Sequence, residues 1–190
     1  QHNLLLLIDE VQSGIGRTGK FYAHEHAGVR ADAIAMAKGL GGGFPMGAFA
    51  YTKAIREVLT PGAHGSTFGG SPLACAAGVA ALDVFRDEGL MERARLLEPV
   101  LETLVHELRE EPHVIDIRNL GLAAAIELAP RPGEATKRAM EVFHHCFDHG
   151  AMVRYTGDII ALSPPLIISK AQIDELVGTL AAALRETAAE

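Results

Sequence analysis

The sequence predicts an α/β fold, and two patterns support this prediction. Three short apolar runs bounded by Gly, Asp or Pro lie at residues 4–8, 33–37 and 47–51. Such runs are typical of strands buried on both faces of a parallel or mixed sheet. Helical periodicity begins near residue 72, and beyond residue 110 strand-like and helical segments alternate. The first half is therefore predicted to supply a sheet layer, and the second half a separate α+β unit.

Two helices are predicted in the middle of the chain. Ser71 and Pro72 suit the N-cap and first position of a helix whose apolar residues continue to Gly89. A second amphipathic helix begins at Leu90, and Pro99 is expected either to kink it or to restart it. These two helices lead away from the predicted sheet.

The rest of the chain is predicted to alternate between strands and helices. The expected strands cover 114–117, 123–128 and 159–162, and the expected helices cover 134–149 and 169–184. The last helix should begin with a capping box, because Ser169 is followed three residues later by Gln172. A domain boundary is placed near residue 88, which divides the chain into domains at 1–88 and 89–190.

Composition favours small-molecule chemistry. The net charge of -7 in 190 residues offers no basic surface for nucleic acid or anionic lipid. The apolar run at 4–8 is far shorter than the ~20 residues that cross a bilayer, so no membrane association is expected. Cys75 and Cys146 are too few for a disulfide framework, which indicates a reducing cytoplasm. A strand pattern directly after Gln1 suggests a piece that lacks its N-terminal part.

A glycine-rich segment at residues 14–20 (GIGRTGK) matches two nucleotide-binding patterns, G-x-x-x-x-G-K and G-x-G-x-x-G. The next residue is Phe21, where a P-loop needs a Ser or Thr to bind magnesium. Asp9 and Glu10 directly ahead of the loop would repel phosphates, and the segment after it lacks the apolar face of a docking helix. Nucleotide binding is therefore not expected.

Asp9 and Lys38 follow two of the predicted strands. Ligands of open α/β sheets sit beyond the carboxyl ends of such strands, so the two side chains are expected to face one crevice. The glycines at 39 and 41–43 would let a bulky cofactor approach the backbone. An amine for a Schiff base and a carboxylate for a pyridine nitrogen are the minimum for pyridoxal phosphate chemistry. From spacing alone, a strand-end capping Asp and a solvated Lys remain the alternative.

The histidines raise the possibility of a metal site. His145 and His149 are four residues apart and could share a helix face near Cys146. No third ligand follows at a suitable spacing, and His149 before Gly150 suits the end of a helix. No metal site is predicted.

Three ordered blocks carry a family resemblance: LLIDEVQSGIGRTGKF, DAIAMAKGLGGGFPMGA and HGSTFGGSPLACAAG. They resemble the second half of the catalytic domain of class III aminotransferases, the ornithine and omega-amino-acid transaminase family. VIDIRNLGLAAAIELAPRPG and MVRYTGDIIALSPPLIIS are similar to the small domain of its omega-amino acid:pyruvate branch. The first blocks look more like the acetylornithine branch. The resemblance implies fold type I, with part of a large domain built on a mixed, mainly parallel sheet, then a small α+β domain.

The resemblance also implies roles for single residues around pyridoxal 5′-phosphate. Asp9 would bind the pyridine nitrogen, Val11 would pack on the ring and Gln12 would bond its phenolic oxygen. Lys38 would form the Schiff base and then act as the base that moves the substrate proton. On this interpretation residues 14–20 shape the substrate entrance.

Three further residues complete the predicted site. Ser66 and Thr67 are hydroxyl donors in a glycine-flanked loop before a helix, which suits an anion, although such residues also commonly cap helices. By resemblance, Thr67 would donate to the cofactor phosphate of the neighbouring subunit in a homodimer with shared active sites. Arg154 would grip the substrate carboxylate, for which a forked guanidinium is suited. An ordinary solvated strand arginine is the alternative.

The expected reaction is amino transfer from an omega-amino acid or amine, such as beta-alanine, to pyruvate or a similar keto acid. An acetylornithine or ornithine aminotransferase is the alternative within the family. An inactive fragment without the N-terminal half, or a related activity that uses the same Asp and Lys, is the alternative outside it.

Overall fold

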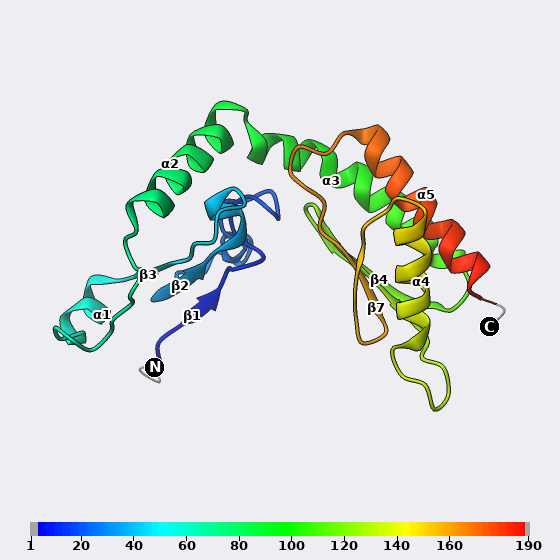
Figure 1. Cartoon of the computed structure of the whole chain (residues 1–190), viewed down its shortest axis with the longest axis horizontal. Coiled ribbons are helices and arrows are strands. Elements are labelled where there is room, and N and C mark those ends of the chain that lie inside the picture. Colours follow the sequence, from blue (N-terminus) through cyan, green and yellow to red (C-terminus); the bar gives the residue numbers. More distant parts are fainter. Residues whose placement is uncertain (1–3, 189–190) are drawn as a thin grey trace. The chain divides into compact units, whose positions relative to one another are not determined.

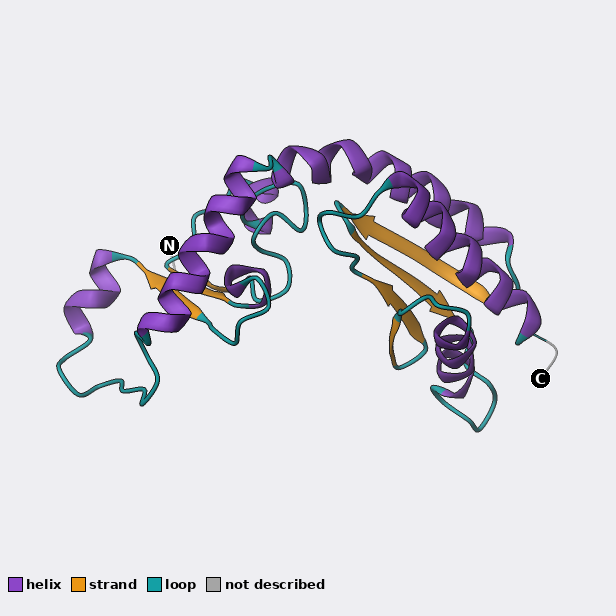
Figure 2. Cartoon of the chain, turned by 45° about the horizontal axis from the view of Figure 1, so that its top comes forward, coloured by secondary structure: helices purple, strands orange, loops and turns teal. Residues whose placement is uncertain are grey.

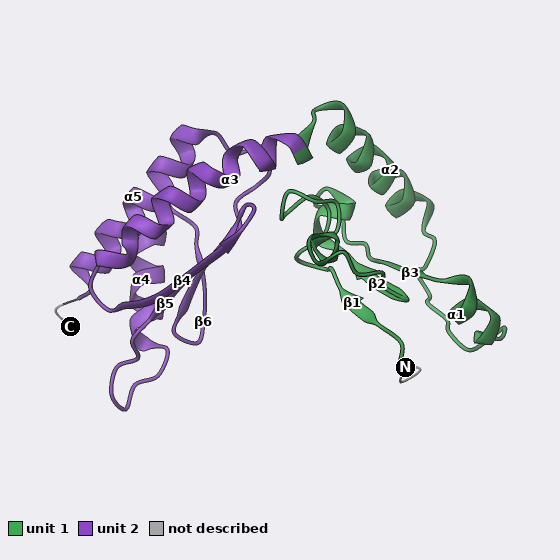
Figure 3. Cartoon of the chain, turned by 180° about the vertical axis from the view of Figure 1, so that it is seen from behind, with its two compact units in different colours: residues 1–91 green, residues 92–190 purple. Residues whose placement is uncertain are grey.

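The computed structural model describes residues 4–188, which form two compact units, Gln1–Met91 and Glu92–Glu190 (Figure 3). The first unit contains β1 (Leu7–Asp9), β2 (Ala33–Met36), β3 (Ala48–Tyr51), α1 (Lys53–Val58), α2 (Pro72–Asp87) and two 3₁₀ helices, η1 (Ala23–Ala27) and η2 (Lys38–Gly41) (Figure 1). The second contains α3 (Leu90–Glu107), η3 (Leu108–Glu110), β4 (Val114–Leu120), β5 (Ala123–Leu128), α4 (Lys137–Asp148), β6 (Arg154–Thr156), β7 (Ile159–Leu162) and α5 (Lys170–Glu186).

The sheet of the first unit is mixed, as predicted. Strand β2 lies in the centre, pairs in parallel with β1 and pairs antiparallel with β3. Its core is small: among the described residues of this unit the buried cluster consists of Ile15, Met36 and Leu40, with Phe21 and Phe85 among the side chains packed on it. Ile15 of the loop that follows β1 is part of this core.

Burial on both faces was expected for all three strands of this sheet, and it is wrong for two of them in this chain. All four residues of β3 are exposed, and Leu7 of β1 is 63% exposed. The physical reason is that residues 4–188 provide no second layer over these strands. Apolar composition alone cannot distinguish a strand that a second layer covers from one that it does not.

The second unit has the complete core of an α+β layer structure. Its antiparallel sheet has the order β4-β5-β7-β6, and alternate residues of β5 and β7 point into the core. Ile126 and Ile160 are fully buried there. Figure 2 shows α3 and α5 side by side over one face of this sheet. The opposite face carries charged side chains, among them Arg118 with its partners Asp116 and Glu127.

Local signals predicted most element ends. The capping box of α5 is confirmed, because Gln172 N–H donates to Ser169 Oγ at 3.2 Å and Ser169 N–H donates to Gln172 Oε1 at 2.9 Å. The expected restart at Pro99 does not occur, and α3 runs continuously through it. Leu101 and Val105 are fully buried on this helix, so packing compensates for the one backbone hydrogen bond that proline removes. None of the helices formed by residues 4–188 combines the length and the hydropathy that crossing a membrane requires.

Cys146 on α4 is predicted to resist thiol reagents in the native protein. Its side chain is fully buried, and burial raises the pKa of the thiol to about 11, so only about 0.1% is thiolate at pH 8. In a Cys75→Ser variant, which leaves Cys146 as the single thiol, a chromogenic disulfide reagent should react only after denaturant is added. Rapid modification in native buffer would contradict the buried position of α4.

Candidate active site

The parallel pairing of β1 with β2 brings predicted site residues to one edge of the sheet. Asp9 is the last residue of β1 and is paired in register with Ala35, and Lys38 follows the end of β2 by two residues. Gln12 lies in the turn after β1. Lys38 Nζ donates a hydrogen bond to Gln12 Oε1 at 3.0 Å, so Asp9, Gln12 and Lys38 share this edge.

Asp9 presents an exposed carboxylate at this edge. Its Oδ1 accepts a hydrogen bond from the backbone N–H of Val11 at 2.9 Å, which closes a tight turn directly after the strand. This is the strand-end turn that the alternative interpretation predicts. The bond uses one of the two carboxylate oxygens and does not bury the group, so the carboxylate can serve both the turn and a ligand.

Lys38 has an unusual backbone conformation. Its φ is 50°, in the left-handed region that side chains other than glycine rarely adopt. The strain lies where β2 changes into η2, and the next residue is Gly39, where a Cβ would lie 3.4 Å from Ile15. Strained residues of this kind cluster at functional sites. The tight turn aims the lysine side chain at Gln12.

The glycine-rich segment at 14–20 forms a series of turns packed over the small core. It leads into η1, a 3₁₀ helix of five residues, whereas a P-loop leads into an α-helix whose N-terminus faces the phosphate. Ile15 of the loop has a φ of 53° and is buried with Met36 and Leu40. The segment therefore packs through Ile15 against Met36 and Leu40, the residues that flank Lys38.

Ser66 and Thr67 lie in the exposed loop between α1 and α2. Gly69 N–H donates to the Ser66 carbonyl at 3.3 Å, and Gly70 has a φ of 77°. Within residues 4–188 neither hydroxyl has a hydrogen-bond partner. Ser71 is the N-cap position of α2, but its side chain accepts no capping bond. The two hydroxyls are thus available to an external anion, although the structure does not bring them to Lys38 by any contact.

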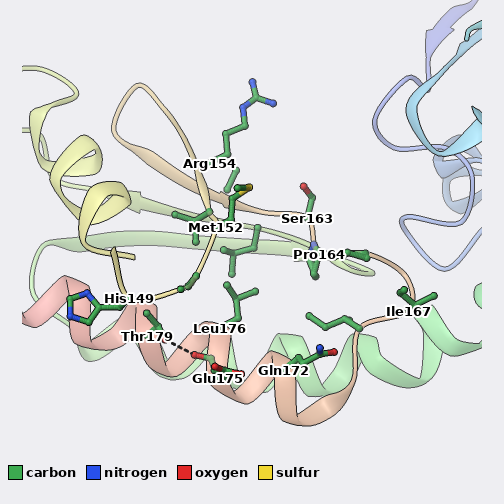
Figure 4. Close-up of a pocket in the computed structure, with 17 residues that line it drawn as sticks. His149, Met152, Arg154, Ser163, Pro164, Ile167, Gln172, Glu175, Leu176 and Thr179 are labelled. Carbon is green, nitrogen blue, oxygen red and sulfur yellow. Dashed lines mark hydrogen bonds between the residues drawn. The ribbon is translucent and has the colours of Figure 1, made fainter. Parts of the chain in front are cut away.

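Arg154 lies in the second unit, on the edge strand β6, which was not predicted as a separate strand. Tyr155 packs against Phe143 on the helix side of the sheet, so Arg154 projects from the opposite face. A pocket of about 800 Å³ lies between the loop before β6, the loop after β7 and one side of α5. Figure 4 shows Arg154 at the rim of this pocket, with its guanidinium pointing away from Gln172 and Leu176. The side chain of Arg154 is exposed at this face.

The paired histidines of α4 interact within the second unit. His145 Nε2 lies 2.8 Å from Glu186 Oε2, and the rings of His145 and His149 stack with centroids 4.2 Å apart. His149 is the C-cap of α4, and its Nδ1 lies 2.8 Å from the carbonyl of His145. Across the described chain, no three His, Cys, Asp or Glu side chains gather closely enough to suggest a metal site.

Sequence analysis grouped Glu10 with Asp9 only as carboxylates that would repel phosphates and gave Glu10 no role in the site; the structure distinguishes the two. Glu10 is 1% exposed, whereas Asp9 is exposed. Burial by itself would raise the pKa of the Glu10 carboxyl, but hydrogen bonds from Ser13 and from the backbone and ring of His24 together lower it below its ordinary value. The alternation of side chains along a strand was the signal that could have separated these neighbours.

Comparison with known proteins identifies the family. The family model described as "Aminotransferase class-III" matches residues 1–184. The chain belongs to the class III aminotransferases. This confirms both the family resemblance and the fold type I interpretation, and the cofactor of this family is pyridoxal 5′-phosphate.

Relatives of this class III aminotransferase chain come from both predicted branches. An omega-aminotransferase of Caulobacter vibrioides is 50% identical over 188 residues, which cover 95% of the chain and 43% of the relative. Acetylornithine aminotransferase 1 of Bordetella pertussis is 43% identical, with 98% of the chain and 46% of the relative covered. The PMP-bound form of an aminotransferase from Vibrio fluvialis superposes with a TM-score of 0.90 at 32% identity, over 99% of the chain and 45% of that structure. The chain spans less than half the length of these proteins.

Proposed function

We propose that the protein is a pyridoxal 5′-phosphate-dependent aminotransferase whose cofactor binds at the edge formed by Asp9, Gln12 and Lys38. The observation that carries this proposal is the 3.0 Å hydrogen bond from Lys38 Nζ to Gln12 Oε1, beside the exposed carboxylate of Asp9. Residues 1–88 would form part of the large cofactor-binding domain, and residues 89–190 the small domain. Family membership supports both assignments.

The donor set fits this cofactor. A primary amine, an exposed carboxylate and an amide meet at one edge, where the cofactor needs an imine partner, a pyridine-nitrogen ligand and a phenolic-oxygen ligand. The Gln12 carbonyl is used by Lys38, which leaves the amide NH₂ to donate to the phenolic oxygen. Val11 follows Asp9 in the same turn and would pack on the ring.

Each side chain has a separate task in amino transfer. Bound pyridoxal phosphate supplies an electron sink for the electron pair left when a proton leaves the substrate carbon. Asp9 keeps the pyridine nitrogen protonated, because its negative charge favours the cation. Lys38 would hold the cofactor through Nζ until the substrate amine takes its place, and the freed amine would then accept the proton from the substrate carbon and return it to the cofactor carbon. Gln12 orients Lys38 for both steps.

The assembly is proposed to be a homodimer in the cytoplasm. Thr67, with Ser66 beside it, would donate to the cofactor phosphate of the neighbouring subunit, and their free hydroxyls in an exposed loop support this role. The free thiols Cys75 and Cys146 fit a reducing compartment. The partners are otherwise small molecules, an amino donor and a keto acid.

The proposed substrates are an omega-amino acid or amine as donor and pyruvate or a similar keto acid as acceptor. The relative at 50% identity that bears the name omega-aminotransferase supports this choice. The acetylornithine aminotransferases at 43% identity support the second candidate, transfer from acetylornithine or ornithine. The test is alanine formation from pyruvate by the complete natural protein, with beta-alanine, acetylornithine and ornithine as donors. Faster turnover of acetylornithine would favour the second candidate, and no transfer from any donor would refute both.

Arg154→Ala is predicted to separate carboxylated donors from simple amines. A bidentate guanidinium–carboxylate pair is a charge-assisted interaction, so kcat/KM for beta-alanine should fall by about tenfold to a hundredfold. An uncharged aromatic amine should be largely unaffected. Arg154→Lys should recover only part of the loss, because a point charge lacks the planar fork. The donor half-reaction is measured in single turnovers, because pyruvate also carries a carboxylate.

Arg118→Ala is the matched control for this prediction. Arg118 projects from the same face of the sheet, in the row that runs through Ala125 and Ala161 to Arg154, but it is paired with Asp116 and Glu127. Arg118→Ala should leave kcat/KM unchanged for both donors. If kcat/KM falls equally for both donors in Arg154→Ala, the residue supports the fold rather than donor binding. If kcat/KM does not change, Arg154 is an ordinary solvated arginine.

A further inference from the structure

Glu10 is a fully buried carboxylate, and it is tied to two separate segments. Its Oε2 accepts a hydrogen bond from Ser13 Oγ at 2.5 Å. Its Oε1 accepts one from the backbone N–H of His24 at 2.9 Å and one from His24 Nδ1–H at 3.0 Å. A buried carboxylate without such partners would strongly destabilise the protein. Here both carboxylate oxygens accept hydrogen bonds from nearby residues, which offsets the cost of burial.

The bond between Glu10 and Ser13 closes a small ring around the two residues between them. Those residues are Val11 and Gln12. Glu10 N–H also donates to the Ala35 carbonyl at 2.9 Å, which anchors one side of the ring to β2. With Glu10 anchored to β2 and Ser13 tied back to Glu10, the turn restricts how far the backbone of Gln12 can move away from Lys38.

A close backbone approach reinforces the same ring. Gly14 N–H donates to the Glu10 carbonyl at 3.0 Å, and a Cβ at Gly14 would lie 2.8 Å from that oxygen. Only glycine fits at such a distance from a backbone atom. His24, at the start of η1, closes the other side of the Glu10 carboxylate and is itself stacked on Tyr22. The loop after β1 is thus folded directly over Glu10.

We propose that Glu10 is a positioning residue for the cofactor site: its carboxylate, bound by Ser13 and His24, holds closed the turn that contains Val11 and Gln12, and so keeps Gln12 within reach of Lys38. This inference rests on the proposed function, because it assigns to Glu10 the task of orienting residues that contact the cofactor. Of the two adjacent carboxylates, Asp9 faces the cofactor and Glu10 supports the turn from inside.

The test is the affinity of the complete natural protein for pyridoxal 5′-phosphate, measured by titrating the cofactor-free protein and following absorbance. Glu10→Ala leaves the partly buried donors of Ser13 and His24 without an acceptor, so the dissociation constant should rise by about tenfold or more. Glu10→Gln keeps the carbonyl oxygen for His24 and offers its NH₂ to Ser13 Oγ, so affinity should return to within about threefold of wild type. Urea unfolding of the cofactor-free proteins records stability separately.

Glu25→Ala is the matched control. Glu25 lies on the same 3₁₀ helix, and its Oε1 accepts a hydrogen bond from Tyr22 N–H at 2.8 Å, but it has no bond to the turn after β1. Its removal loosens η1 without opening the ring at Val11 and Gln12, so cofactor affinity should stay within about twofold of wild type. Equal weakening by Glu25→Ala would assign the effect to general loosening and overturn the proposal.

The remaining outcomes each decide the inference. Wild-type affinity in Glu10→Ala, or no rescue by Glu10→Gln, overturns it while leaving the proposed function intact. If Glu10→Ala does not fold, Ser13→Ala opens the ring and keeps the buried carboxylate; weaker cofactor binding supports the inference and unchanged binding overturns it. A wild-type protein that does not bind the cofactor refutes the proposed function and the inference together.

Discussion

Replacing Lys38 with alanine should remove covalent attachment of pyridoxal 5′-phosphate to the protein and lower amino transfer by at least about 10³-fold. Only an amine can condense with the aldehyde of the cofactor, and the loss of a general base alone lowers rates by about 10²- to 10⁴-fold. Lys38 is exposed, so its removal should change the free energy of unfolding by no more than about 0.5 kcal/mol. The loss is therefore chemical rather than structural.

Borohydride reduction of the cofactor-loaded protein, followed by digestion and peptide mass spectrometry, locates the attachment. The label should lie on the Lys38 peptide of the wild type and be absent from Lys38→Ala. Lys20→Ala is the control, because Lys20 ends the glycine-rich segment and should keep the label on Lys38. A label that survives Lys38→Ala, or that moves with Lys20, would overturn the assignment of the reactive lysine.

Asp9→Asn should bind the cofactor and yet transfer amino groups at least about 10²-fold more slowly. Asparagine keeps a carbonyl oxygen to accept the Val11 N–H bond, so the turn after β1 survives. It lacks the negative charge that favours a protonated pyridine nitrogen, and losing one preorganised electrostatic group costs about this much in rate. The measurement is the single-turnover rate of the donor half-reaction at saturating cofactor.

The matched control for Asp9→Asn is Asp32→Asn. Asp32 is also an aspartate that accepts a backbone hydrogen bond beside β1, from Leu6 N–H at 2.8 Å, but it lies at the opposite end of that strand. Its rate should remain within about twofold of wild type. A near-normal rate in Asp9→Asn would remove this carboxylate from the site, and an equal fall in both variants would indicate a structural effect.

Local sequence signals predicted the elements of the second unit well because each signal acts within a few residues. The capping box at Ser169 and Gln172 begins α5, and alternating burial marks β5 and β7. The bounds of strand β6 were not predicted, because its residues Arg154–Thr156 form no apolar run of the kind that marked the other strands. Of the two outcomes expected at Pro99, a kink or a restart, the sequence could not exclude the restart, since propensity is a weak guide where a helix face is fully buried.

The candidate site was predictable as a set of residue types, but its arrangement was not. Asp9 and Lys38 could be assigned to strand ends, because strand ends of open sheets are recognisable from apolar runs. The hydrogen bond between Lys38 and Gln12 depends on the parallel register of β1 with β2 and on the left-handed backbone of Lys38. Neither the register nor a positive φ at lysine leaves a pattern in a single sequence.

The sequence by itself determined most element types and the chemistry available to the protein, since these follow from residue identity and short-range spacing, and it determined the class through resemblance to a known family. Only the tertiary structure decided which of two adjacent carboxylates faces outward, because that choice depends on the donors of Ser13 and His24 that enclose Glu10. Tertiary structure likewise placed Arg154 on the face of the sheet that the helices leave open. Burial and long-range hydrogen bonding are properties of the packed chain. Through these two properties, side chains with the same chemistry come to have different roles.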